Sequence, residues 1–269
     1  MPELPEMETY KNLLSPLIIG KEITSTQVTR EKSINVSIDQ WNEVVLGNNI
    51  TAISRRAKHI LFHLENHQNL LMHLMLGGWM FWGNEGDKPE RTVQVQLSFG
   101  EQQLYFIGLR LGYLHLYSDE ELELKLPKLG PEPMDSSFSE AMFTERLHKR
   151  RGVLKPVMVD QSFLSGVGNC YSDEICYVAA LRPDRKIETF MEKEVAALYR
   201  ATRSVLHEAV TYGGYMDHPL FTGDKQTGGY NERCQVYDRE GEPCLRCKEG
   251  IVRVEVSGRK SFYCPGCQH

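Results

Sequence analysis

Residues 244–267 have the sequence CLRCKEGIVRVEVSGRKSFYCPGC, in which two Cys-x-x-Cys pairs are separated by sixteen residues. Each pair can present two sulfur atoms on one tight turn, and the residues between the pairs are long enough for one β-hairpin. Four thiolates with this spacing suit a tetrahedral zinc ion, whereas the alternatives are two disulfides or four free thiols. The sequence therefore predicts a zinc ribbon. Its expected ligands are Cys244, Cys247, Cys264 and Cys267.

The turn of the expected hairpin carries two cations. Ser257-Gly258-Arg259-Lys260 would be held rigidly by the metal, and such a turn suits contact with phosphate groups, although an ordinary solvated basic turn is the alternative. Zinc ribbons occur in nucleic-acid binders, ribosomal proteins and polymerase subunits. The ribbon alone therefore indicates a small folded module and defines no reaction.

Composition sets the broad class of the protein. The chain has 269 residues, 41% hydrophobic and 25% charged, which suffices for one large domain or two modest ones and excludes a disordered or fibrous protein. It has no run of about 18 apolar residues, and its start is acidic, unlike a signal peptide. We therefore expect a soluble cytoplasmic protein without a membrane span. The odd cysteine total argues against a secreted disulfide framework, and the three remaining cysteines should pack as small apolar residues; these are Cys170, Cys176 and Cys234.

The net charge of −5 is unevenly distributed. Residues 1–145 have 12 Lys and Arg against 20 Asp and Glu, a balance of −8, whereas residues 146–269 have 19 against 16, a balance of +3. Only the second part has a basic bias, so the charge permits nucleic-acid binding without predicting it.

Short apolar or alternating runs, separated by glycine, asparagine and charged turns, predict strands through the first half. The runs are Ile23–Arg30, Asn49–Ser54, His59–Leu64, Leu70–Leu76, Val93–Phe99, Gln103–Ile107 and Tyr113–Leu116. Ahead of them, proline and acidic residues at Pro5–Thr9 open a helix. A β-sandwich with a leading helix is the simplest packing of these elements.

Helical periodicity follows a linker rich in proline and glycine. The expected helices are Phe138–Arg150, Lys155–Asp160, Asn169–Ala179 and Met191–Tyr212, and short strands return around the cysteines. The sequence thus predicts an α+β protein of two domains. The expected boundaries are 1–128 for the β-sandwich, 129–136 for the linker, 137–231 for the helical module and 232–269 for the zinc hairpin.

The turn Phe163–Asn169, FLSGVGN, ends at an asparagine suited to cap the helix that follows. Amides at a helix start can bind an anion. Arg150, Arg151 and Lys155 lie shortly before this turn and supply a cationic approach. The alternatives are an ordinary capped helix and a solvated charged face.

The motifs of the chain, taken in order, resemble the formamidopyrimidine-DNA glycosylase family along essentially the whole length. They are Met1-Pro2-Glu3-Leu4-Pro5-Glu6, Arg55–Lys58, His73-Leu74, Leu129–Pro133, Lys155-Pro156, Gly166–Tyr171, Gln235–Tyr237 and the terminal cysteines. The resemblance implies a β-sandwich, a helix-two-turn-helix module and a zinc finger, with damaged double-stranded DNA bound between the halves. We expect a monomer.

The chemistry of this family suits the start of the chain. If Met1 is removed, Pro2 exposes a secondary amine, and α-amino groups have a pKa of about 7.7–8.0, so a neutral nucleophile exists near pH 7. Its attack on C1′ would displace a damaged base and leave an iminium that permits β-elimination. The resemblance gives Glu3 the role of a proton donor or shuttle. The alternative for Pro2 is a helix-entry proline, although Pro5 is the better candidate for that role.

The resemblance assigns further roles. Lys58 would act on the sugar-phosphate, Arg259 would hold the phosphate of the flipped nucleotide and assist δ-elimination, and Asn169 would bind a phosphate beside the lesion. His73 and Lys155 match DNA-contacting positions. Residues Gly213–Tyr230 match a mobile loop that covers the extruded base, and Tyr230 is expected to contact DNA.

The chain departs from the family where relatives fill the gap left by the flipped base with methionine, arginine and phenylalanine. Leu76, Leu109 and Leu111 stand at the matching positions, and Thr92 replaces a DNA-contacting histidine. A leucine wedge can kink a duplex but cannot donate hydrogen bonds to the opposite base, and Arg110 is the candidate donor that would compensate. We expect weak opposite-base discrimination and poor or altered activity on 8-oxoguanine. Oxidised pyrimidines, formamidopyrimidines and abasic sites are the other candidate substrates.

The sequence thus favours a base-excision-repair glycosylase with abasic-site lyase activity. Two other classes stay open. A non-catalytic protein that binds lesions or abasic sites would keep the fold and form no covalent intermediate, and retention of Met1 would mark it. A zinc-ribbon regulator or RNA-binding factor would explain the C-terminal module but leave Pro2, Glu3 and Lys58 without a purpose.

Overall fold

The computed structural model describes residues 1–126 and 128–269 and forms two compact units. The first unit comprises Met1–Pro127 and Tyr212–Gly229, and the second comprises Lys128–Thr211 and Tyr230–His269. Tyr212–Gly229 is thus a late segment of the chain that returns to the first unit. The domain boundaries expected from the sequence stay a prediction. Among the described residues, no helix is long and apolar enough to cross a membrane, and the cytoplasmic location stays a prediction.

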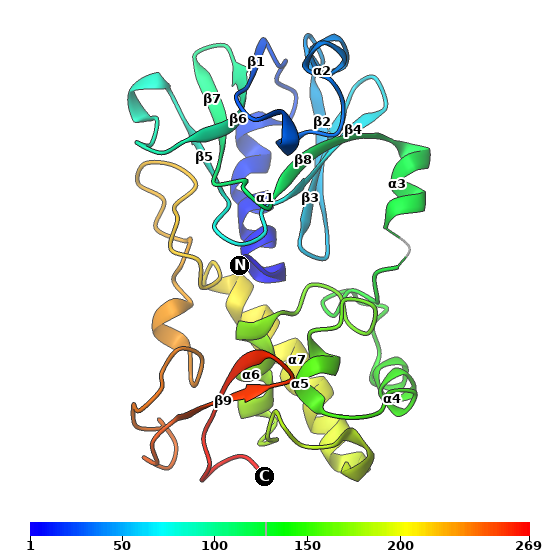
Figure 1. Ribbon diagram of the computed structural model, residues 1–269, viewed down its shortest axis with the longest axis vertical. Helices are drawn as coiled ribbons and strands as arrows, with labels where there is room; N and C mark the ends of the chain where they lie inside the picture. Colours follow the sequence, from blue (N-terminus) through cyan, green and yellow to red (C-terminus); the bar gives the residue numbers. More distant parts are fainter. Residues whose placement is uncertain (127) are drawn as a thin grey trace. The chain divides into compact units, whose positions relative to one another are not determined.

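The first unit contains two antiparallel four-stranded sheets, with strand orders β1-β6-β7-β5 and β2-β3-β4-β8 (Figure 1). The strands are β1 (Ser25–Val28), β2 (Ile50–Arg56), β3 (His59–Leu64), β4 (Gln68–His73), β5 (Trp79–Gly83), β6 (Val93–Phe99), β7 (Gln102–Ile107) and β8 (Tyr113–Ser118). The helices are α1 (Leu4–Ile18), α2 (Ile38–Val45) and α3 (Asp119–Lys125), with 3-10 turns η1 (Glu31–Ser33) and η2 (Glu85–Asp87).

One hydrophobic core joins both sheets to α1 and α2. Phe62 on β3 meets Phe106 on β7 edge to face, with ring centroids 6.1 Å apart, and Tyr10 of α1 and Trp41 of α2 are fully buried in the same cluster. Apolar faces of two sheets that bury one another define a β-sandwich. The predicted fold class, with its leading helix, is confirmed.

Three elements of this unit were not expected from the sequence: α2, α3 and β5. Local signals for the two helices were present, because Ser37 and Ser118 accept hydrogen bonds from backbone N–H groups in the first turns of α2 and α3. The aromatic run of β5, WMFWG, is only five residues long and begins directly after two glycines. Its pairing with β7 decides that it is a strand.

The second unit is mainly helical and contains one β-hairpin next to the four clustered cysteines. Its helices are α4 (Glu140–His148), α5 (Leu154–Met158), α6 (Asn169–Val178) and α7 (Glu192–Thr211), its 3-10 turns η3 (Ile187–Thr189) and η4 (Asn231–Arg233), and its strands β9 (Val252–Val256) and β10 (Arg259–Tyr263). The prediction that Asn169 caps α6 is wrong. Gly168 occupies the cap position, and Asn169 is the exposed first residue of the helix.

Glycines hold two loops of the first unit in backbone contact. Gly108 has a φ of +69°, and a Cβ built on it would lie 2.1 Å from the carbonyl oxygen of Gly77. A Cβ on Gly112 would lie 2.6 Å from the carbonyl oxygens of His73, at the end of β4, and Leu74, just after it. The loop after β4 and the loop after β7 therefore form one platform that admits no side chain at its contact.

Gly108→Ala should destabilise the protein more than Gly100→Ala. Both glycines have a φ of +69°, but a Cβ on Gly100 meets nothing within 4 Å. Gly100→Ala should cost about 1 kcal/mol for backbone strain alone, and Gly108→Ala about 1–3 kcal/mol more because the loops must separate. Urea unfolding of the two variants measures the difference, and equal free energies of unfolding would contradict the close contact.

Candidate active site and metal centre

Two buried carboxylates lie at the start of α1. The backbone N–H of Glu3 donates to Oε2 of Glu6 at 2.7 Å, and the N–H of Tyr215 donates to Oε1 of Glu6 at 2.9 Å. Gly214 permits this approach, since a Cβ there would lie 2.2 Å from the same Oε1. Glu6 therefore joins the N-terminus to the segment Tyr212–Gly229, which lies more than 200 residues away in sequence.

Tyr215 also contacts the first residue of the chain. Its hydroxyl accepts a hydrogen bond from the Met1 ammonium at 3.2 Å and donates to the Met1 carbonyl oxygen at 2.8 Å. Pro2 is buried. The phenol thus lies beside the peptide bond that joins Met1 to Pro2, and no motif of the sequence assigned Tyr215 a specific role.

Lys58 lies at the turn between β2 and β3 and is 6% exposed. Burial lowers the pKa of its ammonium, while the charges of Glu3 and Glu6 act in the opposite direction. Lys58, Glu3 and Glu6 therefore form a buried cluster of one cation and two acids in the first unit, and the buried Pro2 adjoins it in sequence through Glu3.

His73 at the end of β4 stacks on His59 at the start of β3, with ring centroids 4.4 Å apart. Burial lowers the pKa of His73 to about 3 and that of His59 to about 4. The Tyr113 hydroxyl lies 3.1 Å from Nε2 of His59, and Nδ1 of His59 lies 3.3 Å from the Arg56 carbonyl oxygen. Both imidazoles are neutral near pH 7, so His73 offers a ligand a neutral hydrogen bond rather than a positive charge.

The two-loop platform presents two leucines to solvent. Leu76 and Leu111 are 65% and 63% exposed, and with Arg30 and Arg110 they line a cavity of about 600 Å³. Leu109 is fully buried in the core, and its N–H is bound by a glutamine side chain of β6. The expectation that Leu109 contacts DNA is therefore wrong. Its side chain packs inward, and two leucines remain available.

Lys155 is the centre of a buried network in the second unit. It is fully buried, and its Nζ donates to Asp173 Oδ1 at 2.7 Å and to the Asn169 carbonyl oxygen at 2.8 Å. Asp173 also accepts from the Ser261 hydroxyl and from the Phe262 N–H. The expectation that Lys155 contacts DNA is wrong, because its ammonium is enclosed. Lys155 instead links α5 to α6, and through Asp173 to β10.

Burial raises the pKa of Asp173 to about 6, although Lys155, Ser261 and the Phe262 N–H all favour its charged form. The neighbouring Glu174 is fully buried as well, and its carboxylate accepts three backbone N–H bonds, at 2.8–3.0 Å, from Gln235–Tyr237. Two adjacent acids of α6 thus hold the segment before the zinc hairpin and the hairpin itself.

The other expected DNA contacts of the second unit differ in accessibility. Asn169, Arg151 and Arg259 are exposed, and Arg150 forms an ion pair with Asp160 at 3.0 Å while remaining partly accessible. Tyr230 is 3% exposed and packs on Tyr171 within the second unit. The expectation that Tyr230 contacts DNA is therefore wrong. The segment before it, expected as a mobile loop, packs into the first unit, where Leu220 is fully buried.

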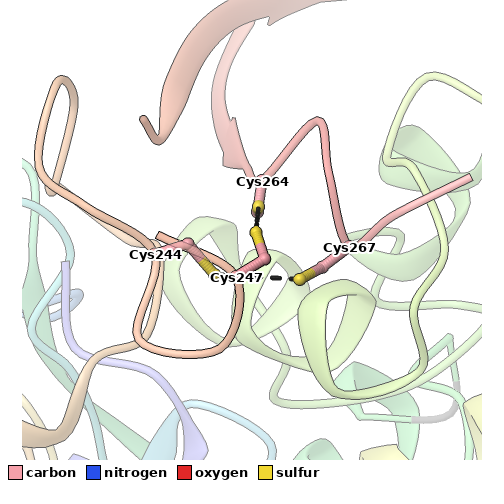
Figure 2. A group of neighbouring side chains, drawn as sticks. All are labelled: Cys244, Cys247, Cys264 and Cys267. Atoms are coloured by element: carbon pink, nitrogen blue, oxygen red, sulfur yellow. Dashed lines mark hydrogen bonds between the residues drawn. The ribbon is translucent and has the colours of Figure 1, made fainter. Parts of the chain in front are cut away.

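The four cysteines of the two Cys-x-x-Cys pairs point toward one another (Figure 2). All four sulfur atoms lie within 4.8 Å of each other, with Cys247 and Cys264 at 3.3 Å and Cys244 and Cys267 at 3.8 Å. A tetrahedral zinc ion with Zn–S bonds of about 2.3 Å requires sulfur atoms roughly 3.8 Å apart. The Arg246 N–H donates to Cys244 at 3.4 Å, which stabilises a thiolate. The donor set and its geometry fit zinc, and the disulfide alternative is wrong because all four cysteines are free.

Comparison with known proteins agrees along the whole chain. Residues 1–113 match the formamidopyrimidine-DNA glycosylase N-terminal domain, residues 129–218 its H2TH domain, and residues 241–269 a zinc finger found in FPG and IleRS. A formamidopyrimidine-DNA glycosylase of Pelotomaculum thermopropionicum is 35% identical, with 100% of this chain and 99% of the relative covered. One of Carboxydothermus hydrogenoformans is 32% identical over the full length of both chains.

The chain belongs to the formamidopyrimidine-DNA glycosylase family. Membership places it among the DNA glycosylases of base excision repair, and the expected structural zinc is confirmed by the zinc-finger match and the four-cysteine cluster.

Solved structures of this family share its fold. A Lactococcus lactis Fpg mutant in complex with Fapy-dG-containing DNA has 30% identity and a TM-score of 0.93, with both chains fully covered. Lactococcus lactis Fpg in complex with abasic-site DNA has 29% identity and a TM-score of 0.93, with 99% of each chain covered.

Lys155→Met should destabilise the protein by about 3–5 kcal/mol, because it leaves Asp173 buried without its cation. Adding Asp173→Asn should recover part of this loss, since the uncompensated carboxylate is then gone. Urea unfolding of both single variants and the double variant measures the coupling, and strictly additive effects would contradict the network. Lys149→Met is the control and should leave stability unchanged, because its partner Glu145 is solvent-exposed.

Proposed function

We propose that the protein is a DNA glycosylase and abasic-site lyase that removes oxidised or ring-opened bases from duplex DNA through Pro2. The observation that carries this proposal is the enclosure of the chain start by Glu3, Glu6, Lys58 and Tyr215. Burying the two carboxylates and the ammonium costs free energy. A helix start with only a structural role does not require them, whereas an active site does.

Pro2 acts after removal of Met1, which frees a secondary amine. The neutral nitrogen forms a bond to C1′ of the damaged nucleotide, and the electron pair of the glycosidic bond leaves with the base, which takes up a proton. Opening of the sugar then gives an iminium between the Pro2 nitrogen and C1′. Loss of a C2′ proton expels the 3′ phosphate, and water releases the sugar fragment from Pro2.

Glu3 supplies or relays the proton that the opening sugar needs, since it lies next to the nucleophile and is 2% exposed. Lys58 contacts the sugar-phosphate of the same nucleotide. The lowered pKa of its ammonium eases release of a proton, and the nearby acids keep it cationic in the free enzyme.

The phosphates of the DNA are contacted by His73 in the first unit and by Asn169, Arg150, Arg151 and Arg259 in the second. Arg259 begins β10 and follows a tight turn at Ser257 and Gly258, which have φ values of 51° and 75°. The zinc ion anchors this hairpin and takes no part in the reaction. The enzyme acts as a monomer.

Leu76 and Leu111 enter the gap left by the extruded nucleotide. Aliphatic side chains fill that space without hydrogen-bonding the orphaned base. Arg30 binds the carbonyl oxygens of Leu109 and Arg110, while the exposed side chain of Arg110 lines the same cavity beside the two leucines. The protein should therefore discriminate weakly between the four opposite bases.

A lesion-binding protein without catalysis is the second candidate, and one observation favours it. Met1 is hydrogen-bonded at both its ammonium and its carbonyl by Tyr215, which stabilises a chain start in which the Pro2 nitrogen is an amide. Such a protein would bind abasic DNA and form no adduct.

Borohydride trapping on a duplex with one abasic site should give a covalent adduct only when Met1 is absent. The Met-free chain is compared with the Met-retaining chain and with Pro2→Thr. We expect the adduct to fall at least about a hundredfold in the Met-retaining chain, because its Pro2 nitrogen is an amide and its Met1 ammonium is held by Tyr215. The fall should be smaller in Pro2→Thr, because its primary amine can still form an imine with the abasic aldehyde. Tight binding without any adduct in the Met-free chain would support the second candidate.

Excision of 8-oxoguanine placed opposite each of the four bases should vary by less than about tenfold, since the two leucines that enter the gap offer the opposite base no hydrogen-bond donor. Single-turnover rates on four otherwise identical duplexes measure this. Strong preference for cytosine would refute the role given to Leu76 and Leu111, and the Leu111→Arg variant tests whether a donor at this loop creates such a preference.

A further inference from the structure

One face of α6 is directed at the zinc hairpin. Asp173 on this face accepts the Phe262 N–H of β10. Tyr177 lies four residues later and therefore on the same face of the helix. Its hydroxyl lies 3.3 Å from Sγ of Cys244, which is one of the four clustered cysteines. The helix therefore contacts a zinc ligand directly, through a side chain that lies outside the cysteine motif.

The phenol is the donor in this contact. A cysteine that binds zinc is a thiolate and has no proton to give, whereas a tyrosine hydroxyl can donate. Tyr177 is fully buried, and within the part of the chain that the structure describes Cys244 is the one partner recorded for its hydroxyl. The bond to a thiolate is charge-assisted, a class about twice as strong as bonds between neutral groups.

Cys244 needs such a donor because its surroundings are apolar. Its side chain is fully buried in a small core that also contains Val236, Ile251 and Phe262. A charge buried in such surroundings without hydrogen bonds is costly. Cys247, by contrast, is exposed, so water can solvate its sulfur. The buried ligand therefore depends on protein donors that the exposed ligand does not need.

Arg246 lies between the first two ligands in sequence and holds the phenol in place. Its backbone N–H donates to Sγ of Cys244 at 3.4 Å, and its Nη1 donates to the Tyr177 carbonyl oxygen at 3.1 Å. Its guanidinium lies over the Tyr177 ring, 4.1 Å from the centroid. A cation over the ring withdraws electron density from the phenol and makes the hydroxyl a stronger donor. Arg246 therefore acts on one sulfur twice, through its own backbone and through Tyr177.

We propose that the Tyr177 hydroxyl, held by Arg246, sets how tightly the four cysteines retain zinc. The hydroxyl offsets part of the charge that Cys244 brings into the apolar core. Groups that bond to a metal ligand typically account for about 10–100-fold in metal affinity. Zinc retention is thus a joint property of α6 and the hairpin, and the cysteine motif alone does not fix it.

Tyr177→Phe removes the hydroxyl and keeps the ring beneath Arg246. We expect this variant to release zinc to the chelator pyridylazoresorcinol at least about tenfold faster than the wild type. Tyr263→Phe is the matched control. Tyr263 is also buried beneath an arginine, with Arg182 4.8 Å from its ring centroid, and it directly precedes the ligand Cys264. It should release zinc at the wild-type rate.

A wild-type rate of zinc release in Tyr177→Phe would overturn the proposal. Equal acceleration in Tyr177→Phe and Tyr263→Phe would overturn it as well, because any buried tyrosine near the site would then have the same effect.

Cobalt(II) bound in place of zinc reports on the thiolates themselves. Its sulfur-to-metal charge-transfer band lies at higher energy when a hydrogen bond stabilises the electron pairs of a sulfur ligand. Tyr177→Phe should therefore shift this band to longer wavelength, and Tyr263→Phe should leave it in place. An unmoved band in Tyr177→Phe would overturn the proposal whatever the release rates, because faster release also follows from a loosened hairpin.

Arg246→Met tests the arrangement in a protein that keeps the hydroxyl. The backbone N–H to Cys244 remains, and the cation over the Tyr177 ring is lost. Zinc release should be several-fold faster than in the wild type, and adding Arg246→Met to Tyr177→Phe should change it little, because the two residues act through one bond. Equal acceleration in both backgrounds would overturn the role given to Arg246.

Discussion

A buried carboxylate is tolerated only when hydrogen bonds replace its lost water, and this constraint decides where distant segments of the chain meet. In the first unit Glu6 accepts the N–H groups of Glu3 and Tyr215. In the second, Asp173 and Glu174 of α6 bind the zinc hairpin and the segment before it. Three acids thus join elements that the sequence separates by 60 to more than 200 residues.

These contacts place the functional groups of each unit. Tyr215 reaches the chain start because Glu6 holds its backbone, and Gly214 leaves room for that carboxylate. The Lys155 ammonium has a positioning role, since it connects the carbonyl of Asn169 to Asp173 and through Asp173 to β10, which begins at Arg259. Burial likewise decides the charge of His73. It lowers the pKa of the imidazole because the charged form would lose its hydration, so the side chain is neutral near pH 7.

Features that depend on short stretches of chain were predictable. The zinc site follows from two local turns and one hairpin, because tetrahedral coordination needs only four thiols at suitable spacing. The longer strands and helices were predicted from the periodicity of their apolar residues. The β-sandwich was predicted from the number and order of the strands in the first half of the chain. Short α2, α3 and β5 were missed, since a few residues carry too little periodicity to reveal an element.

The sequence by itself determined the family, the fold class and the zinc ligands, and the family resemblance supplied Pro2, Glu3 and Lys58 as the residues of the proposed chemistry. Only the tertiary structure decided which of the matching side chains reach the surface. Leu111 is exposed while Leu109, two residues earlier, fills the core, and Lys155 and Tyr230 are enclosed. The packing of Tyr212–Gly229 against β5 was equally beyond the sequence. The physical reason is that burial is a property of long-range contacts, and a residue's type and spacing leave open which side of a turn or loop those contacts will cover.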